Sequence, residues 1–198
     1  MTKYYNCLAL ALLLTAAACT KTADKKAEAP TGKPADVAAL QREYATLRDT
    51  LDGRWTQMMA SDDEKIFFQK RLLQEISYVP GADVTLVNRL QVANERLKAR
   101  RYAQTTMVSD SIDAYDRTQE AVLLPLRDLA YKYVTTTKRP VIGELLEAIQ
   151  RNDDLVVRYR GTYDQAARAY NSWLQLHQAQ VPAAANAKPV PLFSLTGA

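Results

Sequence analysis

Few residues of this chain have the chemistry that catalysis or metal binding usually requires. Its 198 residues include one histidine (His177), two cysteines (Cys7 and Cys19) and six glycines. A single histidine excludes most histidine-based catalysis and metal sites built from several histidines. The sequence has no H-E-x-x-H, C-x-x-C or serine-elbow motif. His177 falls near the end of a helical pattern, where it pairs with the helix dipole or lies at the edge of a core, with a ligand role as the alternative.

The carboxylates occur in three groups. The groups are Asp62, Asp63 and Glu64; Asp110, Asp113 and Asp116; and Asp153 and Asp154. Two members of the middle group could share a cation on one helix face, but the Glu-x-x-His pairs of di-metal bundles are absent. We interpret the three groups as solvated helix faces and partners of helix N-termini. We therefore predict a protein that is not an enzyme and that uses no metal and no cofactor.

The first nineteen residues, MTKYYNCLALALLLTAAAC, have the layout of an export signal. Lys3 precedes an uncharged stretch that is shorter than the roughly 20 residues of a membrane-spanning helix. Three alanines then lead to Cys19, so residues 1–18 are predicted to be a lipoprotein signal peptide and Cys19 the lipidated residue. An ordinary cleaved signal and a retained signal anchor are the alternatives. Loss of Cys7 with the signal would leave no thiol for a disulfide.

The positive net charge lies mostly outside the predicted folded part. The chain carries a formal charge of +4, of which one unit is Lys3, one belongs to residues 20–36 and one is Lys188. The remaining part is near +1, so the concentrated basic face that nucleic-acid binding needs is not expected. We predict no nucleic-acid partner.

Both ends of the mature chain lack helical periodicity. Residues 19–36 comprise the lipidated cysteine and a polar Ala/Lys/Pro-rich tether. Residues 181–198 contain three prolines and are predicted to form an extended Pro/Ala-rich tail. Leu192 and Phe193 in this tail are candidates for docking on the domain or for binding a partner.

Residues 37–180 show helical spacing throughout. Apolar residues recur every three or four positions from Val37 to Met58, and the pattern resumes at Ile66 until Pro80-Gly81 stops it. Ser61–Glu64 has the form of a capping box, so it either starts a new helix or lies within one long helix. Asp83 is a plausible N-cap for a second helix.

The second helix ends in a basic run, and the third contains a proline. Arg96, Lys98, Arg100 and Arg101 precede Tyr102 and are interpreted as a solvated helix end, with phospholipid headgroups or an anionic polymer as the alternative contact. The third helix begins near Ser109-Asp110. Its Pro125 should kink or split it.

The last helix has the most regular pattern. It begins at Pro140 and carries apolar residues at alternating steps of three and four up to His177, a heptad pattern that includes Asn152. A buried Asn at such a position can set the register of a helix pair. A helix of this length needs a partner equally long, and residues 36–79 are the candidate. The predicted fold is all-α, an elongated antiparallel bundle of about four helices with long first and last helices.

The two long helices also resemble a known family. The first carries Tyr44-x-x-Leu47-x-x-x-x-Asp52-x-x-Trp55-x-Gln57, and the last carries Arg160-x-x-Tyr163-Asp164-x-Ala166-x-x-x-Tyr170-Asn171. Both segments resemble the LemA family of membrane-tethered bacterial helical bundles. The family usually has Tyr-Asn at both tyrosine positions, whereas Asp164 follows Tyr163 here. The resemblance implies a helical bundle and membrane tethering, and no particular reaction.

These features together predict a membrane-anchored cell-envelope lipoprotein that binds another envelope protein. A carrier of a small molecule or lipid, with a cavity near Pro125 and the tyrosines, is the alternative, and a homo-oligomer is also open. The candidate partner or ligand surface comprises Trp55, Tyr159, Tyr163, Tyr170 and Asn171. Core packing is the competing role for the tyrosines. Because Thr20 rather than Asp follows Cys19, we expect the outer membrane, facing the periplasm, if the cell is Gram-negative.

Overall fold

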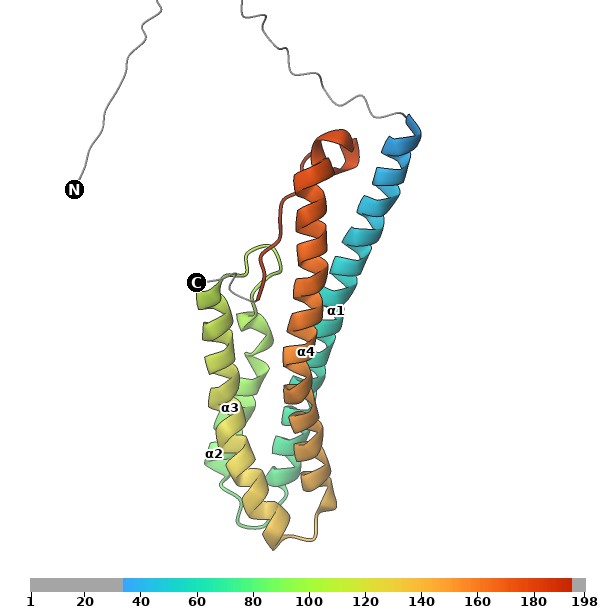
Figure 1. The fold of residues 1–198 in the computed structure, drawn as a ribbon. Coiled ribbons are helices and arrows are strands. Elements are labelled where there is room, and N and C mark those ends of the chain that lie inside the picture. The colour runs from blue at the N-terminus through green and yellow to red at the C-terminus, as the bar shows by residue number, and fades with distance from the viewer. Residues whose placement is uncertain (1–33, 194–198) are drawn as a thin grey trace, which may run out of the picture. The chain divides into compact units, whose positions relative to one another are not determined.

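The computed structural model describes residues 34–193, and these residues form an all-α bundle, as the sequence predicts. The four helices are α1 (Pro34–Ser77), α2 (Val84–Glu95), α3 (Ser109–Thr136) and α4 (Pro140–His177) (Figure 1). Short 3-10 helices lie in the connections: η1 (Lys98–Arg100), η2 (Gln178–Gln180) and η3 (Pro182–Ala184). The described residues contain no strand. With 44 and 38 residues, α1 and α4 are the long first and last helices that the sequence predicts.

The long helices α1 and α4 form an antiparallel pair, so that the start of α1 lies near the end of α4 (Figure 1). At 1.5 Å per residue, α4 is about 57 Å long. Their apolar residues repeat every three or four positions and therefore lie on one face of each helix. The segment Ser61–Glu64 lies inside α1, which continues without a break. The alternative of a new helix start at Ser61 is therefore wrong.

Local signals set the ends of the shorter helices. The Asp83 carboxylate accepts a hydrogen bond from the backbone N–H of Leu86 at 2.9 Å, which confirms Asp83 as the N-cap of α2. Gly81, with a φ of 78°, makes the turn between α1 and α2 in a conformation that favours glycine. Pro125 lies inside α3 without splitting it. Ala121, one turn earlier, is exposed, so water can satisfy the carbonyl that loses its N–H partner.

The helices α2 and α3 cover one half of the α1–α4 pair (Figure 1). We call this part the four-helix half, and the part containing the start of α1 and the end of α4 the two-helix half. All four helices contribute to the apolar cluster of the four-helix half, whose most buried members are Leu72, Leu73, Ile76, Val87, Leu126 and Ile142. This half therefore has the core of an ordinary helical bundle.

A second apolar cluster fills the two-helix half, and it is rich in aromatic residues. Tyr44 lies between Tyr170 and Trp173, with ring centroids 6.1 and 5.2 Å away, and Trp55 packs edge-on against Tyr163 at 5.5 Å. In this half of the bundle, irregular segments of the chain cover the cluster in place of α2 and α3. The covering residues are Tyr102, Met107, Val181, Ala184, Ala187, Val190, Leu192 and Phe193.

The C-terminal segment is thus part of the core as far as residue 193. Val181 is 1% exposed and Ala184 is fully buried, although the sequence predicts an extended tail from residue 181. Leu192 and Phe193 pack on the domain, which is one of the two roles that the sequence suggests for them. Prolines at 182, 189 and 191 break the helical pattern, but they do not prevent an extended segment from packing.

Several sequence predictions concern residues outside the described range. The signal peptide (1–18), Cys19, most of the tether (19–36) and residues 194–198 are among them. The helix α1 begins at Pro34, within the predicted tether. Within residues 34–193, no helix combines the length and the apolar character that crossing a membrane requires.

A pair of leucines on α3 tests this packing. Leu126 is fully buried and Leu124 is 53% exposed, two positions away on the same helix. Leu126→Ala should lower the free energy of unfolding by about 3 kcal/mol, because it leaves a cavity in the core. Leu124→Ala should change it by less than about 0.5 kcal/mol. Urea denaturation followed by far-UV circular dichroism measures both, and equal losses would contradict the described orientation of α3.

Candidate functional site

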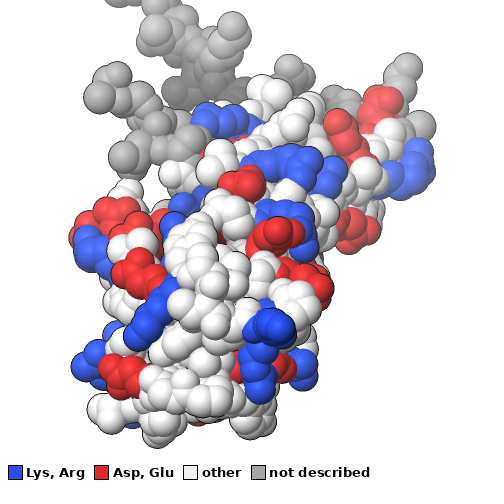
Figure 2. All heavy atoms as spheres, turned by 90° about the horizontal axis from the view of Figure 1, so that it is seen from below, with Lys and Arg blue, Asp and Glu red and all other residues white. Residues whose placement is uncertain are grey.

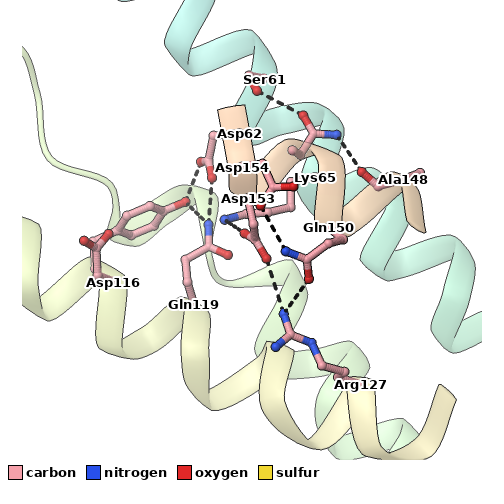
Figure 3. A network of polar contacts seen from close by, with 12 residues as sticks. Ser61, Asp62, Lys65, Asp116, Gln119, Arg127, Ala148, Gln150, Asp153 and Asp154 are labelled. Carbon is pink, nitrogen blue, oxygen red and sulfur yellow. Dashed lines mark hydrogen bonds and ion pairs between the residues drawn. The ribbon is translucent and has the colours of Figure 1, made fainter. Parts of the chain in front are cut away.

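A layer of polar side chains separates the two apolar clusters. Each of the three longer helices places one polar residue on its apolar face at this level. These residues are Asp62 on α1 and Gln119 on α3 (Figure 3), and Asn152 on α4, which accepts a hydrogen bond from Ser61 of α1. Burying such groups is costly unless each has hydrogen-bond partners. We call these residues and their direct partners the polar layer.

The carboxylate of Asp62 is the centre of the polar layer. Its Oδ1 accepts a hydrogen bond from Gln119 Nε2 at 2.7 Å, and its Oδ2 accepts one from the Tyr115 hydroxyl at 2.5 Å (Figure 3). Arg101 Nε lies 2.5 Å from the same Oδ2, and the side chains of Asp62 and Arg101 are each 14% exposed. Burial, together with the negative charge of Asp62, raises the pKa of Tyr115 well above its usual value. Tyr115 is therefore a neutral hydrogen-bond donor at physiological pH.

Arg101 connects the polar layer to a second carboxylate, Asp63. The Arg101 guanidinium forms an ion pair with Asp63, which also pairs with Lys98 Nζ at 3.0 Å. Burial alone would raise the pKa of Asp63, but hydrogen bonds from Arg101 and Lys98 more than offset this, and the pKa is lower than usual. The interpretation of this basic run as a solvated helix end is therefore wrong for Arg101, whereas the side chain of Lys98 remains 55% exposed. The chain turns after η1 and brings Arg101 inward.

A second ion-pair group links α1 and α4 with α3. Lys65, which is 8% exposed, places Nζ 3.2 Å from Asp153 Oδ1, and Arg127 of α3 approaches Asp153 Oδ2 at 3.6 Å (Figure 3). Beside it, Ser61 donates a hydrogen bond to Asn152 Oδ1 at 3.0 Å. Because Asn152 pairs directly with α1, it fixes the register of α1 against α4, which is the role that the sequence suggests for a buried Asn.

Arg160 forms the boundary between the polar layer and the aromatic cluster. Its guanidinium binds both oxygens of Asp116, at 2.9 and 2.6 Å. The same group lies over the ring of Phe193, 5.2 Å from the ring centroid. Burial would lower the pKa of Arg160, but Asp116 raises it, so the positive charge is secure. This geometry combines a bidentate ion pair with a cation–π contact.

A cleft of about 360 Å³ opens between α1, α3 and α4 at the polar layer. Its floor carries the charged groups described above, and exposed apolar side chains such as Leu124 lie at its rim. Both signs of charge are present in the wall: Asp62, Asp116, Glu120 and Asp153 against Lys65, Arg127 and Arg160. The volume is at the lower end of the range for small-ligand sites, or suits one or two side chains of a larger partner.

The five candidate surface residues lie in different environments. Tyr163 is fully buried and Tyr170 is 6% exposed, so both are core residues of the aromatic cluster. Burial raises the pKa of Tyr163 to about 12. Trp55 is half-buried beside Tyr163, Tyr159 lines the cleft, and Asn171 binds the backbone of residue 190. The structure thus brings the side chains of Trp55 and Tyr163 together, and Tyr159 lies one turn before Tyr163 on α4 in the wall of the cleft.

The carboxylate groups and His177 have structural partners. Asp62 and Asp153 form ion pairs with side chains only 14% and 22% exposed, so the interpretation as solvated faces is wrong for these two. Asp63 and Asp116 also form ion pairs, but their side chains remain 45% and 41% exposed. No group of three or more potential metal ligands occurs among residues 34–193. His177 packs on Trp173 with ring centroids 5.5 Å apart, at the edge of the aromatic cluster.

The polar layer contains residues that the sequence analysis missed, above all Asp62, Lys65 and Arg101. One signal was available: after Leu51, Trp55 and Met58, the next position on the apolar face of α1 is Asp62. The inward turn of Arg101 has no such signal, because it depends on the irregular chain after η1.

The hydrogen-bond partner of Ser61, the serine of the cleft, is an amide. The hydroxyl of Ser61 donates to the amide oxygen of Asn152, and an amide oxygen cannot act as a general base. Charges at the far end of the bundle, where α1 joins α2 and α3 joins α4, are mixed in sign around uncharged surface (Figure 2). The fold and the cleft together define an all-α bundle with a polar-walled cleft.

No family model matches the chain, and comparisons with curated proteins and with solved structures found no match.

Two neighbouring carboxylates test the polar layer. Asp62→Ala should lower the free energy of unfolding by about 3 kcal/mol, because it leaves buried donors of Arg101, Tyr115 and Gln119 without their acceptor. Asp63→Ala should cost less than about 1 kcal/mol, because that ion pair is more exposed. Urea denaturation of both variants is the measurement. A larger loss for Asp63→Ala would contradict the central position of Asp62.

Proposed function

We propose that this chain is a non-enzymatic, lipid-anchored protein of the cell envelope that binds another envelope protein, and that the cleft is part of its binding surface. The proposal combines a cellular location, inferred from the first nineteen residues, with a binding site, inferred from the bundle. It requires no metal, no cofactor and no nucleic acid.

The sequence pattern around Cys19 supports the proposed location in the cell envelope. An uncharged stretch followed by three alanines and a cysteine is typical of bacterial lipoprotein signals. Several acyl chains on one cysteine anchor a protein stably in a membrane. The resemblance to the LemA family, carried by residues such as Tyr44, Trp55 and Tyr170, also favours membrane tethering. In a Gram-negative cell, Thr20 favours the outer membrane, facing the periplasm.

One observation supports a polypeptide as the bound partner. The bundle already holds an extended piece of protein chain, residues 190–193, against the wall of the cleft. Phe193 in this piece contacts Tyr102 and Arg160, and both of these residues line the cleft. A surface that holds extended chain through backbone hydrogen bonds has the chemistry of a peptide-binding surface.

A small-molecule or lipid carrier is the second candidate. It is favoured by the volume of the cleft, about 360 Å³, and by the presence of Leu123, Val156 and Tyr159 beside its polar wall. A ligand that pairs polar groups with an apolar part would fit such a wall.

Site-specific photo-crosslinking in intact cells tests the location of the binding surface. A photoreactive residue in place of Leu124, at the rim of the cleft, should capture one reproducible envelope protein. The matched control is Val92 on α2, which is similarly exposed (48% against 53%) and contributes nothing to the cleft. Val92 should capture nothing above background. Equal capture at both positions would contradict the cleft as the binding surface.

If Leu124 captures no protein, native mass spectrometry of chain purified from envelopes decides between the candidates. A bound species of discrete small mass would replace the first candidate with the second. An empty chain would contradict both.

The lipid anchor has its own test. Cys19→Ser should move the protein from the membrane fraction to the soluble fraction and remove the lipid mass from its N-terminal peptide, because serine has no thiol to acylate. Cys7→Ser, inside the predicted signal, should leave both unchanged. Fractionation and mass spectrometry are the measurements, and membrane retention of the Cys19→Ser variant would show a different mode of attachment.

A further inference from the structure

Residues 190–193 are held on α4 mainly through their backbone. Asn171 donates from Nδ2 to the carbonyl oxygen of Val190 at 2.8 Å and accepts from the Val190 N–H through Oδ1 at 2.8 Å. Two turns away, Asp164 Oδ1 accepts from the Phe193 N–H at 2.8 Å. Every residue except proline offers the same backbone groups, so these contacts recognise an extended conformation rather than particular side chains.

The spacing of Asp164 and Asn171 matches the repeat of an extended chain. Seven residues of α-helix advance by about 10.5 Å, and three residues of polyproline-type chain advance by about 9 Å. A chain with three residues per turn would place Val190 and Phe193 on the same side, and the N–H groups of both residues donate to side chains of α4. Pro189 and Pro191 favour this conformation before the segment binds.

One side chain of the segment enters a defined socket. The ring of Phe193 packs edge-on against Tyr163 and Tyr102, with centroid separations of 5.5 and 5.8 Å, and Arg160 lies over its face. We call Tyr102, Tyr163 and Arg160 the aromatic socket. Its electron-rich rings and its cation select an aromatic side chain over an aliphatic one.

The bound segment leaves part of the socket unsatisfied. Arg160 Nε is buried and has no acceptor among residues 34–193. A ligand with a carbonyl or carboxylate oxygen at this point would pair with this donor.

The connection between this segment and η3 is largely exposed, including Ala185, Asn186, Lys188 and Pro189. Gln178 Nε2 donates to the carbonyl oxygens of Ala184, at the end of η3, and of Ala187, within the connection. Its release would uncover the socket and the adjoining wall of the cleft.

We propose that this face of α4, from the aromatic socket to Asn171, is a docking site for an extended segment of the partner protein, with residues 190–193 as its occupant when no partner is present. The partner segment presents free backbone groups opposite Asn171 and, three residues later, an aromatic side chain for the socket. An acceptor oxygen near that aromatic residue pairs with Arg160. The inference rests on the proposed binding function and specifies the partner's chemistry.

A synthetic peptide tests the site in the full mature chain. The probe is a fluorescent peptide of residues 188–194, Lys-Pro-Val-Pro-Leu-Phe-Ser, and its binding is measured by fluorescence anisotropy. Phe193→Ala weakens the resident segment, so this variant should bind the probe at least about tenfold more tightly than the wild type, whose tethered segment competes at high effective concentration. A probe with alanine in place of phenylalanine should not bind.

Controls separate the docking site from general effects. In the Phe193→Ala background, Asn171→Ala should abolish probe binding, whereas Val157→Ala, on an exposed part of α4, should not change it. Circular dichroism verifies that each variant is folded. Failure of folded Phe193→Ala protein to bind the probe, or binding that ignores Asn171→Ala, overturns the proposal.

Two further outcomes are distinguishable. A concentration-dependent dimer of the wild type, seen by light scattering and abolished by Phe193→Ala, would assign the site to a second copy and overturn a foreign partner. If Leu124 still captures an envelope protein while the probe fails to bind, the binding function stands and this docking site is wrong.

Discussion

The apolar faces of α1 and α4 are longer than the helices available to cover them, and the rest of the structure follows from this mismatch. The helices α2 and α3 have 12 and 28 residues, and they cover the four-helix half (Figure 1). Leaving the other half open would expose the rings of Tyr44, Tyr170 and Trp173 to water, which is unfavourable for such large apolar surfaces. Irregular chain from two distant parts of the sequence, near residues 102–107 and 181–193, covers them instead.

The polar layer lies at the level where the cover by α2 and α3 ends and the cover by irregular chain begins. Asp62, Gln119 and Asn152 each interrupt the apolar face of their helix, and they meet at the same level. Buried ion pairs seldom add much stability, because desolvation offsets the attraction between the charges. Their effect is on alignment: a shift of α4 by one turn would separate Ser61 from Asn152 and Lys65 from Asp153, leaving buried groups without partners. The layer therefore favours one arrangement of the helices and keeps the walls of the cleft in place.

The sequence predicted what depends on local periodicity and missed what depends on distant contacts. The cap at Asp83, the start of α4 at Pro140 and the pairing of α1 with α4 follow from residue type and spacing. The docking of Val190 and Phe193 could not be predicted in this way, because backbone groups that bind Asn171 and Asp164 leave no periodic pattern. Neighbouring carboxylates also differ in a way that spacing alone does not show. The side chain of Asp62 is 14% exposed and that of Asp63 is 45% exposed.

The positions of the tryptophans make tryptophan fluorescence sensitive to one half of the bundle and not to the other. The chain has two tryptophans, Trp55 and Trp173, and both belong to the aromatic cluster of the two-helix half. Indole emission therefore reports on the environment of that half, whereas the far-ultraviolet signal averages the helices of both. If the two signals change at different denaturant concentrations, the halves do not unfold as one cooperative unit. The protein thus carries a built-in optical reporter of the region where irregular chain takes the place of helices.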